Sequence, residues 1–262
     1  MPNTYSARVP APQFHQLPST FRPPVREFCR RILRKYPNTV AFAVIGSVAD
    51  STWESDSDID LVWILSGRRR KRWHAELEYD YSGVVELVPL NLKELRRHVA
   101  QHSSLAHSIQ KGLVLYDAKA VLERLKQTPL GPPTSEWKQE AFEFFSRRLD
   151  WGIDSYQREL TFHRKHCRSG HCHCHVSEIL TRAVVNLARL LLIEQGLIPN
   201  SKAEMRSMVP AVLHSSRQRA ALETALQAHH EKRDLSPDEA AELIRLGRNL
   251  RERLTRSLAN QD

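Results

Sequence analysis

Two acidic residues, at positions 58 and 60, lie at the start of an apolar run and are the strongest candidates for catalytic residues in this sequence. Asp58 and Asp60 alternate with Ile59 and Leu61, and the apolar run continues to Leu65. Residues two apart in a β-strand point to the same face, so we expect the two carboxylates side by side. Such a pair is repulsive unless a cation lies between its members, and Mg²⁺ prefers carboxylate, water and phosphate oxygens. The pair therefore predicts the magnesium site that phosphoryl or nucleotidyl transfer requires. The alternative is a solvated pair of acids.

Two neighbouring features could complete such a site. Gly46 and Ser47 follow the apolar run 40–45. A glycine lets the backbone approach a phosphate closely, and a serine hydroxyl and nearby N–H groups can donate to it. Glu86 lies within the apolar segment 84–88, which is typical of an inner strand, where an unpaired carboxylate is costly to bury. Glu86 is thus a candidate third magnesium ligand and general base. The alternatives are an ordinary turn at Gly46, and an exposed edge position or an arginine ion pair for Glu86.

The elements that must position these residues alternate in type. Apolar residues recur at helical spacing near the N-terminus, and short apolar runs bounded by turn residues predict strands. Ser82-Gly83 separates two such runs, which indicates a hairpin. In chain order the expected elements are a helix over 25–36, strands over 40–45 and 59–65, a hairpin of 77–81 and 84–90, a helix over 92–102, a short apolar segment over 113–115 and a helix over 118–126.

A proline- and glycine-rich segment, 127–135, marks the expected domain boundary. Beyond it the apolar residues recur at helical spacing, and Ser236 to Glu239 forms a capping box that opens the last helix. The sequence therefore predicts an extended N-terminal arm over 1–24, an α/β (α+β) domain with a small mixed sheet over 25–128, and an all-α helical bundle over 135–262.

Cysteine and histidine residues crowd into one segment of the second half. Cys167, His171, Cys172 and Cys174 carry the thiolates and imidazole that zinc prefers, so they are a candidate structural Zn²⁺ site. Their spacing matches no standard zinc motif, and the alternative is a polar loop that is rich in histidine.

The composition is that of a globular chain with a basic surface. The formal net charge is +9 and the pI is about 9.6, which favours polyanions such as nucleoside triphosphates and RNA. A solvated, arginine-rich surface without such a partner is the alternative. The longest apolar stretch, 183–193, is interrupted by Asn186 and Arg189 and is too short to cross a bilayer. The N-terminus does not look like a secretory signal, so we expect a cytoplasmic location, no membrane partner and reduced cysteines.

The arrangement of Gly46-Ser47, then ten residues, then Asp58-Ile59-Asp60, with Glu86 on a later strand, resembles nucleotidyltransferases of the DNA polymerase beta superfamily. The likeness covers residues 25–126 and is greatest to minimal nucleotidyltransferases and aminoglycoside-modifying enzymes. It implies a small mixed sheet flanked by helices, Mg²⁺ and a nucleoside triphosphate donor. It also implies that Asp58 and Asp60 bind both metal ions and that Glu86 binds the catalytic one.

One departure from the family concerns the residues after the Gly-Ser pair. Many small members carry a basic residue and a glycine where this chain has Asp50 and Ser51. We therefore expect phosphate contacts to come from elsewhere and the added negative charge to weaken triphosphate binding.

The resemblance implies transfer of a nucleoside monophosphate, AMP from ATP, to the hydroxyl of a small molecule such as an aminoglycoside. The helical half would then form one wall of the acceptor site or a homodimer contact, with Glu136, Glu140 and Glu143 as candidate contacts for a cationic acceptor. One alternative acceptor is tRNA or a protein, which the pI and the arginine-rich segment 68–72 favour. Another alternative is a catalytically silent binding or antitoxin-like module.

Overall fold

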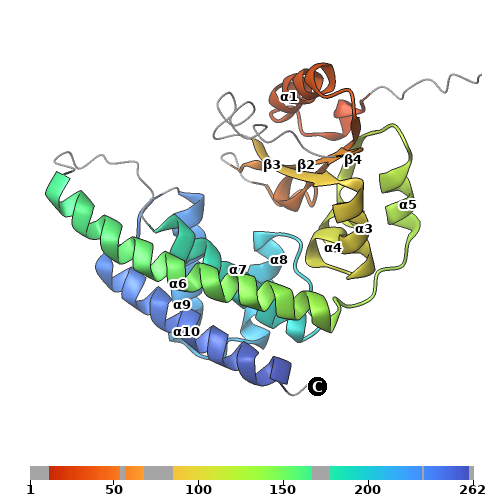
Figure 1. Ribbon diagram of the computed structural model, residues 1–262. Coiled ribbons are helices and arrows are strands. Elements are labelled where there is room, and N and C mark those ends of the chain that lie inside the picture. Colours follow the sequence, from red (N-terminus) through yellow and green to blue (C-terminus); the bar gives the residue numbers. More distant parts are fainter. Residues whose placement is uncertain (1–11, 54–56, 68–84, 167–176, 232, 260–262) are drawn as a thin grey trace, which may run out of the picture. The chain divides into compact units, whose positions relative to one another are not determined.

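The computed structural model describes residues 12–53, 57–67, 85–166, 177–231 and 233–259. The chain divides into two compact units, residues 1–131 and 132–262. The first contains a sheet with helices on both faces, and the second is helical (Figure 1). The prediction of a small mixed sheet domain followed by a helical region is confirmed.

The first unit alternates helices and strands. Its elements are η1 (Phe14–Gln16), α1 (Arg22–Lys35), β1 (Thr39–Ile45), η2 (Gly46–Val48), β2 (Ile59–Leu65), β3 (Val85–Asn91), α3 (Leu92–Ala100), α4 (Ser104–Lys111), β4 (Leu113–Asp117) and α5 (Val121–Gln127).

The four described strands form one mixed sheet in the order β3-β2-β1-β4. β1 pairs antiparallel with both β2 and β4, whereas β2 and β3 are parallel. All seven residues of β1 are buried, because β1 lies inside the sheet and both faces of the sheet are covered.

Alternation along the strands divides the apolar side chains between two cores. Phe42 and Leu61 belong to the core that α1 covers, through residues such as Phe28. Ala43 and Val62 belong to the opposite core, which includes residues of α3, α4 and α5. Figure 1 shows α1 on one side of the sheet and α3 and α4 on the other. Asp60 follows the alternation of Val62 and so lies on the α3–α5 face.

The second unit is a bundle around one core. Its elements are α6 (Ser135–His166), α7 (Glu178–Glu194), α8 (Lys202–Met208), η4 (Val209–Ala211), α9 (Ser216–His230) and α10 (Pro237–Ala259). The apolar face of α7 supplies much of this core, against residues of α6, α9 and α10. None of the helices in the described part of the chain is both long and apolar enough to span a membrane.

The helix expected over 92–102 is slightly shorter in the structure. It ends at Ala100, because His102 adopts a left-handed backbone with φ +48°. Ser103 then caps α4 by accepting a hydrogen bond from the Ala106 N–H at 3.1 Å, so a short helix that the sequence pattern did not indicate begins there. The expected hairpin strand over 77–81 lies outside the described residues.

Candidate functional site

Gly46 turns the chain sharply at the end of β1. Its φ is +72°, a left-handed value that favours glycine. Its carbonyl accepts hydrogen bonds from the N–H groups of Ala49 and Asp50, both at 3.0 Å, and the Ser47 carbonyl accepts one from the Thr52 N–H at 3.0 Å. The segment after β1 is therefore a tight turn, as the glycine predicted.

The strand register brings Asp60 to this turn. Asp60 is opposite Ile45, the residue before Gly46, in the antiparallel β1–β2 pair. A Cβ atom on Gly46 would lie 2.6 Å from Oδ2 of Asp60, which is too close for any real contact. Gly46 is thus required for two reasons, its backbone conformation and the approach of the Asp60 carboxylate.

Glu86 is the register partner of Asp60 in the parallel β2–β3 pair. Register partners on adjacent strands share a face, so both acids lie on the α3–α5 face. The Glu86 side chain is exposed. Among the described strands, β3 lies at the end of the sheet. Glu86 is therefore not the buried acid on an inner strand that the sequence pattern indicated. Asp60 is half-buried, and Asp58, also half-buried, directly precedes β2.

The three acids have the right donor chemistry for magnesium, and their backbone positions converge on one corner of the sheet. Carboxylate oxygens are hard ligands of the kind Mg²⁺ takes. Within the described residues, however, no three His, Cys, Asp or Glu side chains gather closely enough to hold an ion. The backbone positions of the three acids are therefore compatible with a magnesium site at this corner. To bind an ion together, their carboxylate groups would have to move closer to one another.

Trp53 anchors the turn segment to the core. Its ring packs edge-on against Phe21, with centroids 5.2 Å apart, next to the core that α1 covers. The neighbouring residues in the sequence, 50–52 and 54–58, are all polar, so the tryptophan itself was the signal of burial in this stretch. Ser51 has φ +59°, so the backbone keeps a left-handed conformation at the position where many family members have glycine.

The candidate zinc ligands Cys167, His171, Cys172 and Cys174 lie outside the described residues, as does the arginine-rich segment 68–72. Cys29 on α1 is buried, and burial raises the pKa of its thiol, so it is an unreactive core residue.

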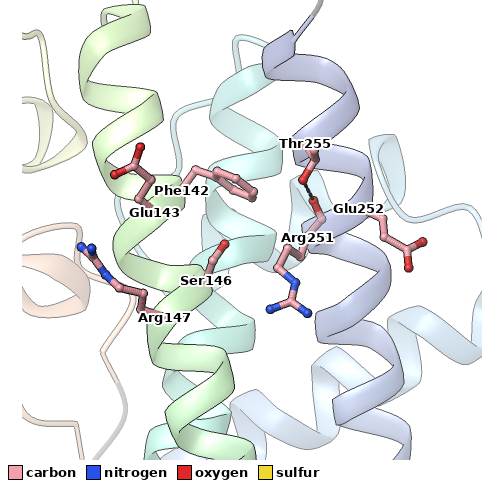
Figure 2. Close-up of a pocket in the computed structure, with 7 residues that line it drawn as sticks. All are labelled: Phe142, Glu143, Ser146, Arg147, Arg251, Glu252 and Thr255. Atoms are coloured by element: carbon pink, nitrogen blue, oxygen red, sulfur yellow. Dashed lines mark hydrogen bonds between the residues drawn. The ribbon is translucent and has the colours of Figure 1, made fainter.

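A groove of about 400 Å³ lies between α6 and α10 of the second unit (Figure 2). The Phe142 ring and the Ser146 hydroxyl point toward α10, whereas the Glu143 and Arg147 side chains point away from it. The Arg251 guanidinium pairs with Asp150 at 2.7 Å. The lining is mostly apolar with charges of both signs at its rim, and none of the predicted catalytic residues belongs to it.

Comparison with known proteins identifies the fold of this site. The family model described as "Nucleotidyltransferase domain" matches residues 25–111. No curated protein matches the chain significantly. The crystal structure of spectinomycin adenyltransferase AAD(9) from Enterococcus faecialis, with ATP and spectinomycin, has a TM-score of 0.55 and 16% identity. That likeness covers 88% of this chain and 98% of the other, and at this identity it concerns the fold alone.

A nucleotidyltransferase-like protein from Exiguobacterium sibiricum 255-15 is 18% identical, over 89% of this chain and 75% of its own, with a TM-score of 0.36 that supports no argument. The family match covers Gly46, Asp58, Asp60 and Glu86. Residues 25–111 of this chain are therefore a nucleotidyltransferase domain.

Proposed function

We propose that the protein transfers a nucleoside monophosphate, AMP from ATP, to the hydroxyl group of a small-molecule acceptor. The observation that carries this proposal is the register of β2: Asp60 lies between Ile45, which precedes Gly46, and Glu86. This register supports a candidate site for nucleotidyl transfer at the corner of the sheet where the glycine turn and the acids lie. The fold that the chain shares with a spectinomycin adenyltransferase supports the small-molecule acceptor.

Asp58 and Asp60 would hold magnesium, which when bound neutralises charge on the triphosphate and on the leaving group. The turn at Gly46-Ser47 places a backbone without a side chain beside Asp60, so a phosphate can approach the Ser47 N–H and hydroxyl. Among the described residues the Ser47 side chain has no hydrogen-bond partner, which leaves its hydroxyl available to donate.

Glu86 would act as the general base. Its exposed position on β3 lets an acceptor from solution reach it, and its register places it next to Asp60. Glu86 takes the proton of the acceptor hydroxyl while the oxygen forms a bond to the α-phosphorus. The bond from that phosphorus to the oxygen that bridges the α- and β-phosphates breaks, and pyrophosphate leaves with the electron pair.

A cationic acceptor would suit the acids of α6. Glu136, Glu140 and Glu143 are all exposed on the first turns of this helix, where they offer negative charge to an aminoglycoside-like molecule. The competing acceptor is tRNA, which the net charge of +9 favours. A cationic small molecule gains nothing from a basic protein surface, whereas tRNA does. The identity of the labelled product distinguishes the small-molecule acceptor from tRNA.

The test is transfer of label from α-labelled ATP, CTP, GTP and UTP with magnesium, in which aminoglycosides, spectinomycin, bulk tRNA and the protein itself are offered as acceptors. Asp60→Asn and Asp58→Asn should abolish both transfer and magnesium-dependent triphosphate binding. Glu86→Gln should keep triphosphate binding and lower kcat by about 100-fold or more, the usual contribution of a general base.

The matched control is Glu27→Gln, because Glu27 is an exposed acid on α1 of the same unit, on the opposite side of the sheet from Asp60. This variant should behave as wild type. If label appears on tRNA, the acceptor proposal is wrong and the transfer chemistry stands. If no transfer and no magnesium-dependent triphosphate binding is found, the domain is a silent binding module.

A further inference from the structure

One side of α6 carries large apolar side chains that the bundle does not cover. In the described part of the chain, the large apolar side chains that stay exposed are those of Phe144 and Trp151, at 49% and 48%. They are seven residues apart, which is about two helical turns, so they lie on the same side of the helix. Single exposed apolar residues are ordinary, whereas neighbours on one helix face form a patch of the kind that marks an interaction surface.

An arginine lies across this patch. The guanidinium carbon of Arg148 is 5.6 Å from the ring centroid of Phe144 and 5.0 Å from that of Trp151. Cation–π attraction to both rings holds the long side chain over the patch. Within the described residues Arg148 has no carboxylate partner, so its charge is available to an acid of another molecule.

The residues on either side of Phe144 are arranged with opposite charges at equal distances. Glu140 is four residues before Phe144 and Arg148 is four residues after it, and both are exposed. Trp137, which is half-buried, is seven residues before Phe144, and Trp151 is seven residues after it. At about 100° per residue, all four lie within about 40° of Phe144 around the helix axis. These five residues are the α6 stripe.

The α6 stripe is complementary to a second copy of itself when the two helices run antiparallel. With a two-fold axis at Phe144, Arg148 faces Glu140 of the second copy, and the symmetry forms the same ion pair again on the other side of the axis. Trp151 faces Trp137 of the second copy, and the two phenylalanine rings meet at the axis. A parallel arrangement would instead place like charges opposite each other.

We propose that the α6 stripe is the interface of a homodimer in which two α6 helices pack antiparallel. The opposite charges at equal distances from Phe144 favour a second copy of the chain as the partner, because such a copy supplies both complements at once. Glu136 and Glu143 lie off the stripe by helical position and stay open to solvent in the dimer. The stripe spans about four helical turns, which is small for an interface, so we expect a dissociation constant in the micromolar range.

The first test is the mass of the full chain by sedimentation equilibrium, at concentrations from about 1 to about 200 µM. The mass should rise from 30.2 kDa to twice that value over this range. Phe144→Ala should weaken association about tenfold or more, because it removes the apolar side chain at the centre of the interface. A protein that stays monomeric at the highest concentration would overturn the proposal.

Charge reversals test the antiparallel pairing directly. Arg148→Glu and Glu140→Arg should each weaken association about tenfold or more, since each replaces both attractive pairs by repulsive ones. An equimolar mixture of the two variants should recover it, because one copy then offers two arginines and the other two glutamates. Both reversals in one chain should also recover it. The matched control is Arg248→Glu, at an exposed arginine of α10, which should associate as wild type does.

Two further outcomes would contradict this interface. Undiminished association of both single reversals would mean that the copies meet through another surface. Weak association of the single reversals without recovery in the mixture would mean that Arg148 and Glu140 do not face each other across the dimer. Circular dichroism of each variant, which should match that of the wild type, separates these outcomes from a loss of fold.

Discussion

Among single residues, Gly46 and Asp60 depend on each other. The glycine has no side chain where the carboxylate lies, and its φ of +72° is one that other residues adopt only at a cost of about 1–2 kcal/mol. Gly46→Ala should therefore strain the turn and displace the Asp60 carboxylate together. We expect magnesium-dependent triphosphate binding to weaken about tenfold or more, as measured by calorimetric titration.

Gly196 provides the matched control for this variant. Its φ is +77°, and a Cβ atom added to it would have no neighbour within 4 Å. Gly196→Ala should lower the free energy of unfolding by a similar amount and leave triphosphate binding unchanged. Equal binding in the two alanine variants would show that the contact with Asp60 has no part in the site.

Among the helices of the second unit, two glycines set how closely neighbours pack. A Cβ atom on Gly152 of α6 would lie 2.7 Å from Cα of Leu180, a backbone atom of α7 that cannot move alone. A Cβ atom on Gly247 of α10 would instead meet the side-chain ends of Leu149 and Val184, at 2.7 and 2.9 Å. The end of the Leu149 side chain can shift, and the stiffer Val184 can yield by a few tenths of an ångström, whereas a backbone contact forces the helices apart.

The two alanine variants should therefore differ, although alanine favours a helix over glycine by about 1 kcal/mol at either site. Gly152→Ala should lower the free energy of unfolding by about 2 kcal/mol or more, and Gly247→Ala should change it by less than about 1 kcal/mol. Urea unfolding followed by circular dichroism measures both. The reverse order would mean that α6 and α7 can separate at little cost.

In the molecule as a whole, the two units have separate cores. The core of the second unit is built entirely from residues after 132, and both cores of the first lie before it. We therefore expect each unit to fold by itself. A fragment of residues 132–262 should be helical and unfold cooperatively in urea, without binding magnesium-triphosphate.

The complementary fragment, residues 1–131, carries the turn and the acids. It should retain magnesium-dependent triphosphate binding, even if the acceptor no longer binds. If residues 132–262 show no cooperative transition, the helical unit depends on the first unit for its stability.

Local patterns in the chain were enough to predict the kinds of element and the chemistry they carry. The buried strands β1 and β2 follow from apolar runs that end at Gly46 and begin after Asp58, because local alternation and turn residues record burial directly. The Gly-Ser turn and the acids also suffice to identify the nucleotidyltransferase domain, which the family match confirms. The assignment of Asp58, Asp60 and Glu86 to catalysis remains a prediction.

Which residues meet could be learned only from the folded chain. The register that pairs Asp60 with Ile45 and Glu86 joins strands distant in sequence, and an alternating pattern does not name the partner strand. The same is true of Gly131, whose N–H donates a hydrogen bond to Nδ1 of His102 at 2.7 Å although the two residues are far apart in the sequence. The exposure of Glu86 depends on which strands lie beside β3. The alternation of side chains along a strand is a local property of the sequence. Which strands pair, and in which register, is decided by the whole fold.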